Sequence, residues 1–185
     1  AAVNPALAEM TAESLDRSLH VRQMRGGYMV QPHPTFVLDL GSGEVDATNA
    51  IHMGHVPNLA VAWAIGSTSN SNTTAIVGDN RLYALACGQQ DRVGAAKLML
   101  ARFDDANEAL TDADIPASPL WRAAGYSDSF FPFSDGLEVF SDAGVKTVFA
   151  SSGGKNFPEI REWAEEQGIC LVTLPDVVCR GFSGH

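Results

Sequence analysis

A short aromatic stretch, YSDSFFPFSDG at residues 126–136, places the strongest constraint on how this chain can fold. Pro132 fixes its own backbone φ angle and biases Phe131 toward an extended conformation, so the stretch cannot lie inside a helix. We therefore predict a rigid loop here, with Ser134 or Asp135 as the N-cap of a helix that follows.

Two interpretations of this aromatic loop follow from its residue types. The phenylalanine rings can form a flat stacking face while aspartate oxygens accept N–H bonds, a combination that suits a planar, nitrogen-rich ligand. Alternatively, the rings form an apolar plug between two elements of the core. The composition of the loop favours neither interpretation over the other.

The rest of the chain alternates between extended and helical patterns. A turn at Asp79-Asn80 between two apolar runs predicts an antiparallel hairpin. Residues 1–16 are expected to form an N-terminal arm or a short helix. Period-two and β-branched runs predict strands at 19–24, 28–31, 36–40, 73–78, 81–88, 146–150 and 168–174. Helical spacing predicts helices at 56–68, 90–110, 136–143 and 157–167.

Length and charge limit the classes of function. A chain of 185 residues with 45% hydrophobic content suits one domain. A formal net charge of −10 argues against unspecific nucleic-acid binding, which needs a basic surface. No apolar run approaches the ~20 residues of a membrane span, and no secretory leader pattern is present. We expect a soluble, cytoplasmic protein without nucleic-acid or membrane partners.

The cysteines and histidines do not form a metal-binding pattern. Cys87, Cys170 and Cys179 contain no CxxC pair, which argues against both a disulfide framework and a zinc site. The H-x-E and P-C-x-x-C strings of zinc deaminases are also absent. His52 and His55 form the close pair HMGH, for which a turn before a helix is favoured over a pair of metal ligands. We expect no metal requirement.

Several segments together resemble one known family. SDSFFPFSDG resembles the SDAFFPFRDG signature of the 5-aminoimidazole-4-carboxamide ribonucleotide (AICAR) transformylase domain, which a bifunctional purine-biosynthesis enzyme combines with IMP cyclohydrolase. CGQQDR resembles the family's AGQxSR, and Asn72 precedes Arg92 by the family's distance. RGGYMVQ, SSGGKNFPEI and CRGFSGH resemble further family segments in the family's order. By these motifs residues 17–185 are identified as the second half of the transformylase domain.

The resemblance implies a fold and a missing pair of residues. Each half of the transformylase domain resembles cytidine deaminase, so we expect an α/β fold: a three-layer α/β/α sandwich with a mixed sheet. The family's adjacent Lys-His catalytic pair belongs to the first half. In this sequence no lysine is next to a histidine. The resemblance therefore implies a binding half without the family's general acid/base pair.

The resemblance also implies roles for individual residues. Asn72 would bind the carboxamide or formyl region, although a turn or capping asparagine is the alternative, and Asp135 would be a carboxylate on the folate side. We expect Asn72 and Asp135 to be catalytic. The nucleotide and its surroundings would be contacted by Arg92, Arg180, Phe130, Phe131, Phe182, Gly153, Gly154 and His185, with Arg180 on the 5′-phosphate and the rings as a platform.

Two segments depart from the family pattern. The family's proline in the glycine turn is replaced by Ser151 or Ser152 and its serine by Lys155, and the tail has one extra residue before His185. Arg92 is independently unusual, because a cation in the first turn of a helix opposes the helix dipole by ~0.3–1 kcal/mol. An anionic partner explains this arginine better than a purely structural role. We expect replacement of Arg92 or Asp135 to remove activity with little change in melting temperature.

Three functional hypotheses remain open from the sequence. The first is one subunit of a split AICAR formyltransferase, with 10-formyltetrahydrofolate as donor, an AICAR-like ribonucleotide as acceptor and the Lys-His half on a second polypeptide. The second is a homo-oligomer with changed chemistry on another amine. The third is a non-catalytic nucleotide- or folate-binding module. Because the family's sites lie at subunit interfaces, the resemblance favours an obligate oligomer.

Overall fold

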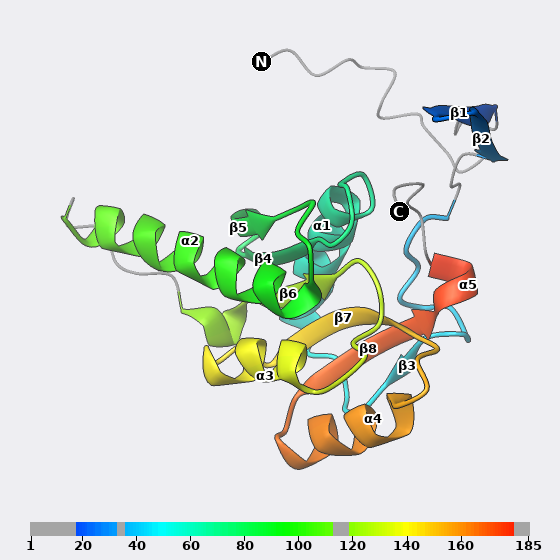
Figure 1. Ribbon diagram of the computed structural model, residues 1–185. Helices are drawn as coiled ribbons and strands as arrows, with labels where there is room; N and C mark the ends of the chain where they lie inside the picture. The colour runs from blue at the N-terminus through cyan, green and yellow to red at the C-terminus, as the bar shows by residue number, and fades with distance from the viewer. Residues whose placement is uncertain (1–17, 33–35, 113–118, 180–185) are drawn as a thin grey trace, which may run out of the picture.

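A six-stranded mixed sheet forms the centre of the protein, as the computed structural model of residues 18–32, 36–112 and 119–179 shows (Figure 1). The strand order is β3-β8-β7-β6-β4-β5. The three strands β6, β7 and β8 run parallel, whereas the pairs β3–β8, β4–β6 and β4–β5 are antiparallel. The strands are β3 (Asp46–Ala47), β4 (Thr74–Gly78), β5 (Arg81–Ala86), β6 (Ala124–Ser127), β7 (Thr147–Ser152) and β8 (Cys170–Pro175).

Helices cover both faces of this sheet. The helices are α1 (Val56–Gly66), α2 (Arg92–Asp112), α3 (Asp135–Asp142), α4 (Phe157–Glu166) and α5 (Asp176–Cys179), with short 3-10 turns at Met53–His55 and Leu120–Arg122. Helices α2, α3 and α4 contribute to one buried cluster, and α1 contributes to a second one. The sheet separates these two clusters, which gives three layers.

Alternation along the strands explains the two clusters. In β4, Ile76 belongs to the cluster under α2, whereas Ala75 and Val77 belong to the cluster under α1. Successive side chains of a strand point to opposite faces, so a strand buried on both sides becomes apolar throughout. In β6 a close approach needs Gly125, because a Cβ there would lie 2.7 Å from the Phe140 ring.

The structure confirms the predicted class, an α/β three-layer sandwich with a mixed sheet. It also confirms the antiparallel hairpin, because β4 and β5 pair across the turn at Asp79-Asn80. Both turn residues have positive φ, 49° for Asp79 and 57° for Asn80, which are angles that Asp and Asn tolerate better than most residues.

The strand predicted at residues 36–40 is wrong. The segment is irregular, although its burial alternates as expected and Phe36, Leu38 and Leu40 pack against the cluster under α1. Phe36 makes an edge contact with Trp63, with ring centroids 5.8 Å apart. The edge of the sheet next to β8 is formed by the two residues of β3. Alternation thus predicts which side chains are buried but not whether the backbone joins a sheet.

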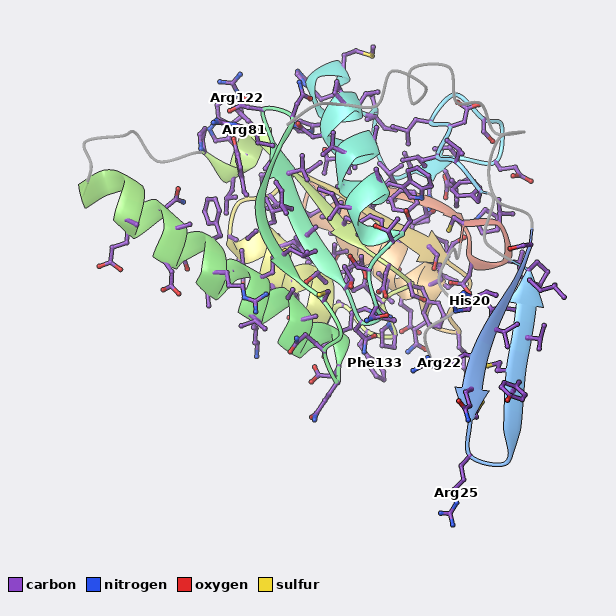
Figure 2. All side chains as sticks on the ribbon, turned by 90° about the horizontal axis from the view of Figure 1, so that it is seen from above. His20, Arg22, Arg25, Arg81, Arg122 and Phe133 are labelled. Carbon is purple, nitrogen blue, oxygen red and sulfur yellow. The ribbon has the colours of Figure 1, made fainter. Side chains whose placement is uncertain are left out.

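A separate two-stranded hairpin precedes the sheet. The two strands predicted at 19–24 and 28–31 are present as β1 (Leu19–Met24) and β2 (Gly27–Pro32), which pair with each other. Figure 2 shows them extending away from the main sheet with Arg25 at the tip. The register places four large apolar side chains on one face, and each is more than half exposed: Leu19 61%, Val21 56%, Tyr28 69% and Val30 52%. This hairpin therefore presents an apolar face that no described residue covers.

Some expectations fall outside the described residues. The proposed N-terminal arm at 1–16 and the tail residues Arg180, Phe182 and His185 lie there, so these expectations stay predictions. Among the helices that the structure describes, none is long and apolar enough to cross a membrane.

Candidate functional site

The candidate site lies at one edge of the sheet, where the parallel strands end; we call it the carboxyl edge. Strands β6, β7 and β8 end there at Ser127, Ser152 and Pro175. The antiparallel strand β4 begins at the same edge, because Thr74 pairs with Ser127. This topology brings together the entrance of β4, the start of α2, the aromatic loop and the glycine turn. Ligand sites of open α/β sheets commonly lie at such edges.

Arg92 begins helix α2 and forms a buried ion pair at this edge. Its Nη1 donates to Asp128 Oδ1 at 2.5 Å and to Ser127 Oγ at 3.1 Å. The arginine side chain is 11% exposed and the aspartate side chain 0%. Ser127 Oγ in turn donates to the carbonyl of Ser129 at 2.9 Å. The end of β6 thus holds Arg92 in one position.

This pair changes the interpretation of Arg92. The anionic partner that the helix-dipole argument requires is Asp128 of the same chain, so that argument no longer demands an external anion. The other oxygen, Asp128 Oδ2, is buried and has no hydrogen-bond partner among the described residues. Buried carboxylate oxygens are rarely left unpaired, because desolvation of an anion is costly. Because the Asp128 side chain is 0% exposed, an external donor would reach this oxygen only after neighbouring residues move.

The aromatic loop contains rings in three environments. Phe131 is 3% exposed, belongs to the core cluster under α2 and makes an edge contact with Phe140 at a centroid distance of 6.4 Å. This burial corrects the expectation of a stacking face for Phe131, to which the plug interpretation applies. Phe130 is half-buried, and Phe133 is 62% exposed. Of the two predicted platform rings that the structure describes, Phe130 is accessible and Phe131 is not.

Phe130 connects the aromatic loop with the glycine turn. A Cβ on Gly154 would lie 2.7 Å from Phe130 Cδ2, so only glycine allows this close approach. Gly153 has φ +131°, which also favours glycine. Asn156 Nδ2 donates to the carbonyl of Pro132 at 2.9 Å and links the two segments again. The predicted turn opens α4, whose first turn contains Pro158 as expected.

Asn72 lies at the entrance of β4, as predicted. Its backbone N–H donates to the carbonyl of Gln89 at 3.3 Å, and the Gln89 N–H donates back to the carbonyl of Asn72 at 3.2 Å. The side-chain Nδ2 also donates to the Gln89 carbonyl, at 3.0 Å. Asn72 therefore has the turn-stabilising role that was the alternative interpretation, and its predicted contact with a ligand would use Oδ1.

Asp135 is exposed at the start of α3. Its Oδ1 accepts from the backbone N–H of Gly136 at 2.8 Å. Ser134 is the N-cap, as one of the two predicted residues, but its hydroxyl donates to Glu138 Oε1 at 2.7 Å instead of capping the backbone. Asp135 is accessible to a ligand, which agrees with the position that its predicted role requires.

Sequence reasoning missed a second acidic residue at this edge. Asp176 Oδ1 accepts from Ser151 Oγ at 2.5 Å and from Ser129 Oγ at 3.2 Å, so it ties the ends of β6 and β7 to helix α5. The chain that leads to Arg180 therefore leaves from the carboxyl edge. A sequence signal existed in Ser151, which follows the strand predicted at 146–150, whereas Ser129 follows β6, a strand that the sequence did not predict. Nothing in the sequence pairs either serine with Asp176.

Tyr126 lies just below this network and is not a base. Its ring stacks on Phe149 with centroids 5.8 Å apart, and helix α1 approaches it at Gly66. Burial, with Asp128 as the next contribution, raises the pKa of Tyr126 far above its ordinary value. The phenol therefore keeps its proton at neutral pH.

The histidine pair lies at the opposite edge of the sheet. His52 and His55 flank the 3-10 turn before α1, which confirms the predicted turn. Within the described ranges, no group of three or more His, Cys, Asp or Glu side chains could hold a metal ion. The three cysteines are free thiols, with Cys87 exposed and Cys170 and Cys179 buried.

A family model and individual relatives both match this chain to the same family of proteins. A family model described as AICARFT/IMPCHase bienzyme matches residues 4–102. The bifunctional purine biosynthesis protein PurH of Roseobacter denitrificans is 29% identical over 166 residues, which are 90% of this chain and 30% of the relative. The protein of the same name from Ruegeria pomeroyi is 30% identical over 152 residues, 82% of this chain and 28% of the relative. The chain thus spans less than a third of the length of these relatives.

Proposed function

This chain belongs to the AICARFT/IMPCHase bienzyme family, and we propose that it is the ligand-binding half of a folate-dependent AICAR formyltransferase. The relatives carry the name bifunctional purine biosynthesis protein, which supports a role in purine biosynthesis. No lysine adjoins a histidine in this sequence. In this proposal a second polypeptide supplies the Lys-His half. The assembled pair, and not this chain alone, would be the formyltransferase.

The grouping of Asn72, Phe130 and the exposed Asp135 at the carboxyl edge is the observation that carries this proposal. A planar ligand with amine and carboxamide N–H groups would supply a donor to Asn72 Oδ1 and a flat surface to the half-buried Phe130 ring. AICAR has both features. These residues therefore fit the proposed acceptor substrate.

The negative charge of the proposed ligands also fits the carboxyl edge. Helices α2, α3 and α4 all begin at the carboxyl edge, where their free N–H groups and positive dipole ends favour anions. A ribonucleotide phosphate and a folate glutamate tail are both anionic. Because Arg92 is neutralised by Asp128, the described residues would bind these anions mainly through backbone N–H groups of the turns.

The residues of this chain would bind and orient the reactants. 10-Formyltetrahydrofolate would supply the formyl group. Asp135, exposed at the start of α3, would accept a hydrogen bond on the folate side, and Asn72 Oδ1 would orient the amide or formyl region of the reactants. An aromatic amine is a poor nucleophile, so formyl transfer needs a proton acceptor and oxyanion donors in addition. We assign those groups to the partner half.

The test is to purify the native complex from the source organism and identify its chains by mass spectrometry. We expect a second polypeptide with an adjacent Lys-His pair in fixed stoichiometry, and formyl transfer to AICAR by the complex but not by this chain alone. In the reconstituted complex, Asp135→Ala should lower the rate at least about 100-fold, comparable to loss of a positioned polar group.

Asp142→Ala is the matched control, because Asp142 is an exposed aspartate at the other end of α3. It should leave the rate unchanged. Both variants should melt within a few degrees of the unsubstituted protein, since the one side-chain bond described for Asp135 is to the next residue. Purification of this chain as a homo-oligomer, without a partner, would overturn the proposal. Turnover of another amine by that homo-oligomer would then favour the hypothesis of changed chemistry.

A further inference from the structure

A cavity lies at the edge of the sheet opposite the candidate site. We call it the amino-edge pocket; its volume is about 420 Å³. The described residues that line it are Asn49, Ala50, His52, His55, Trp121, Lys146, Thr147, Gly168 and Cys170. It lies where β7 and β8 begin, so the six residues of β7 separate it from the carboxyl edge by roughly 20 Å. The pocket is therefore independent of the proposed formyl-transfer site.

The lining of this pocket contrasts with the composition of the chain. The sequence has 22 acidic against 12 basic residues, yet no described residue that lines the pocket is acidic. Lys146 is exposed there and makes no ion pair with any described residue. An isolated cation beside two imidazoles and a hydroxyl favours an anionic ligand.

The imidazole of His55 is fixed as part of the wall. His55 is 7% exposed, its Nδ1 lies 2.6 Å from Thr147 Oγ1, and it also hydrogen-bonds the backbone of Trp121. Burial, followed by the nearby His52, lowers the pKa of His55, so the ring is neutral near pH 7. His55 therefore holds the Trp121 segment against β7 instead of serving as a mobile cation.

His52 presents a donor to the same space. Its Nδ1 accepts from the backbone N–H of Gly54 at 3.2 Å, and its ring lies 5.2 Å from that of His55. Since Nδ1 is the acceptor, the ring proton of the neutral tautomer is on Nε2, which can donate. With the ammonium of Lys146, this gives the pocket two donors for one anionic group.

Trp121 gives the pocket an aromatic wall. The side chain is 63% exposed, which is unusual for so large an apolar ring. It also lines an adjoining cavity of about 220 Å³, where Arg122 lies over its ring at 5.7 Å and pairs with Asp79 at 3.8 Å. Figure 2 shows Arg122 at the end of the molecule away from Phe133. The combined space accepts a flat molecule along the Trp121 ring.

We propose that the amino-edge pocket binds a small planar aromatic anion, with the ring against Trp121 and the anionic group at Lys146 and His52. A metal ion does not fit, because the described residues offer no cluster of three ligands. An aromatic carboxylate and a nucleoside monophosphate share the required chemistry. The pocket volume lies within the range of small-molecule sites.

Isothermal titration calorimetry on the full chain tests this proposal with two probes, 2-naphthoate and adenosine 5′-monophosphate. Saturable binding of either probe is expected, and the tighter one identifies the anion source. Lys146→Gln and Trp121→Ala should each raise the dissociation constant at least about fivefold, consistent with loss of a charge-assisted hydrogen bond or a stacking surface. The neutral analogue 2-naphthylmethanol should bind at least about fivefold more weakly than 2-naphthoate.

Lys97→Gln is the matched control, because Lys97 is an exposed lysine on α2, outside the pocket. Asp128→Asn serves as the control for binding at the carboxyl edge. Neither variant should change the dissociation constant. Equal effects of Lys146→Gln and Lys97→Gln, a loss of binding in Asp128→Asn alone, or no saturable binding of either probe would overturn the proposal. Circular dichroism checks that each variant is folded.

Discussion

The two edges of the sheet differ in whether their charged side chains are paired. At the carboxyl edge, Arg92 and Asp128 are paired and almost fully buried, so their charges contribute to the structure itself. At the amino edge, Lys146 is exposed without a described ionic partner, so its charge remains available to a ligand. A buried pair makes its edge sensitive to substitution, whereas an exposed charge can be changed at little cost to folding.

The largest effect on stability is expected from breaking the buried pair. Arg92→Ala should lower the free energy of unfolding by about 3 kcal/mol or more, because it leaves the Asp128 carboxylate buried and unpaired. This differs from the expectation of unchanged melting that the sequence suggested. Arg81→Ala, at an exposed arginine of β5, should change the free energy by less than about 0.5 kcal/mol. Urea unfolding measures both.

A double variant sharpens this test. Arg92→Ala combined with Asp128→Ala removes both charges and should recover part of the loss, with a coupling energy above about 1 kcal/mol. Additive effects of the two substitutions would contradict a direct interaction between the side chains.

Replacing one glycine at each edge should lower stability by an intermediate amount, which allows the two edges to be compared. At the carboxyl edge, Gly154→Ala should cost about 1–3 kcal/mol, because the new methyl group would lie 2.7 Å from the Phe130 ring. At the amino edge, Gly168 has open space but φ +65°, so Gly168→Ala should cost about 1 kcal/mol through backbone strain. Thermal unfolding distinguishes backbone strain from a steric clash. Gly168→Asn should be more stable than Gly168→Ala, because Asn tolerates a positive φ. The double variant Gly154→Ala with Phe130→Leu should be more stable than Gly154→Ala alone, because the smaller side chain removes the clash.

The smallest expected effect is a pH dependence at the amino edge. The pKa of His55 is lowered from 6.5 by burial and by His52, so the unfolded chain binds a proton more readily than the folded one. This contribution to stability is complete above pH 6.5 and is lost as pH falls toward the folded-state pKa. His55→Gln should flatten the curve of unfolding free energy against pH in that window. If the dependence of stability on pH is the same for His55→Gln as for the unsubstituted protein, the prediction is wrong.

Local rules predicted part of the fold from the sequence. The rigid loop around Pro132, the turn at Asp79-Asn80 and the helix predicted at 157–167 each depend on neighbours in the chain. The structure has all three, with the loop beginning after β6 ends at Ser127 and the helix ending at Glu166. Strand pairing depends on distant residues instead. The segment at 36–40 alternates in burial as a strand would, but its backbone joins no sheet.

The same distinction applies to the site. The hairpin predicted at Asp79-Asn80 accounts for one local contact of the site, because it brings Asn72 beside Gln89, shortly before α2. The partner of Arg92 lies 36 positions away, and the sheet order that brings it close cannot be derived from spacing. No motif unites the lining of the amino-edge pocket, which comes from residues 49–55, 121, 146–147 and 168–170. Such a site becomes visible only after the fold is known.

The exposed hairpin at residues 19–32 has a consequence for how this chain behaves in solution. Its apolar face, which includes Tyr28 and Val30, favours contact between copies, while a net charge of −10 drives copies apart. That repulsion reaches roughly 10 Å at 0.1 M salt and roughly 3 Å at 1 M. Added salt therefore weakens the barrier but not the attraction. We therefore expect any contact between copies through this face to increase with ionic strength, so variants should be compared at one salt concentration.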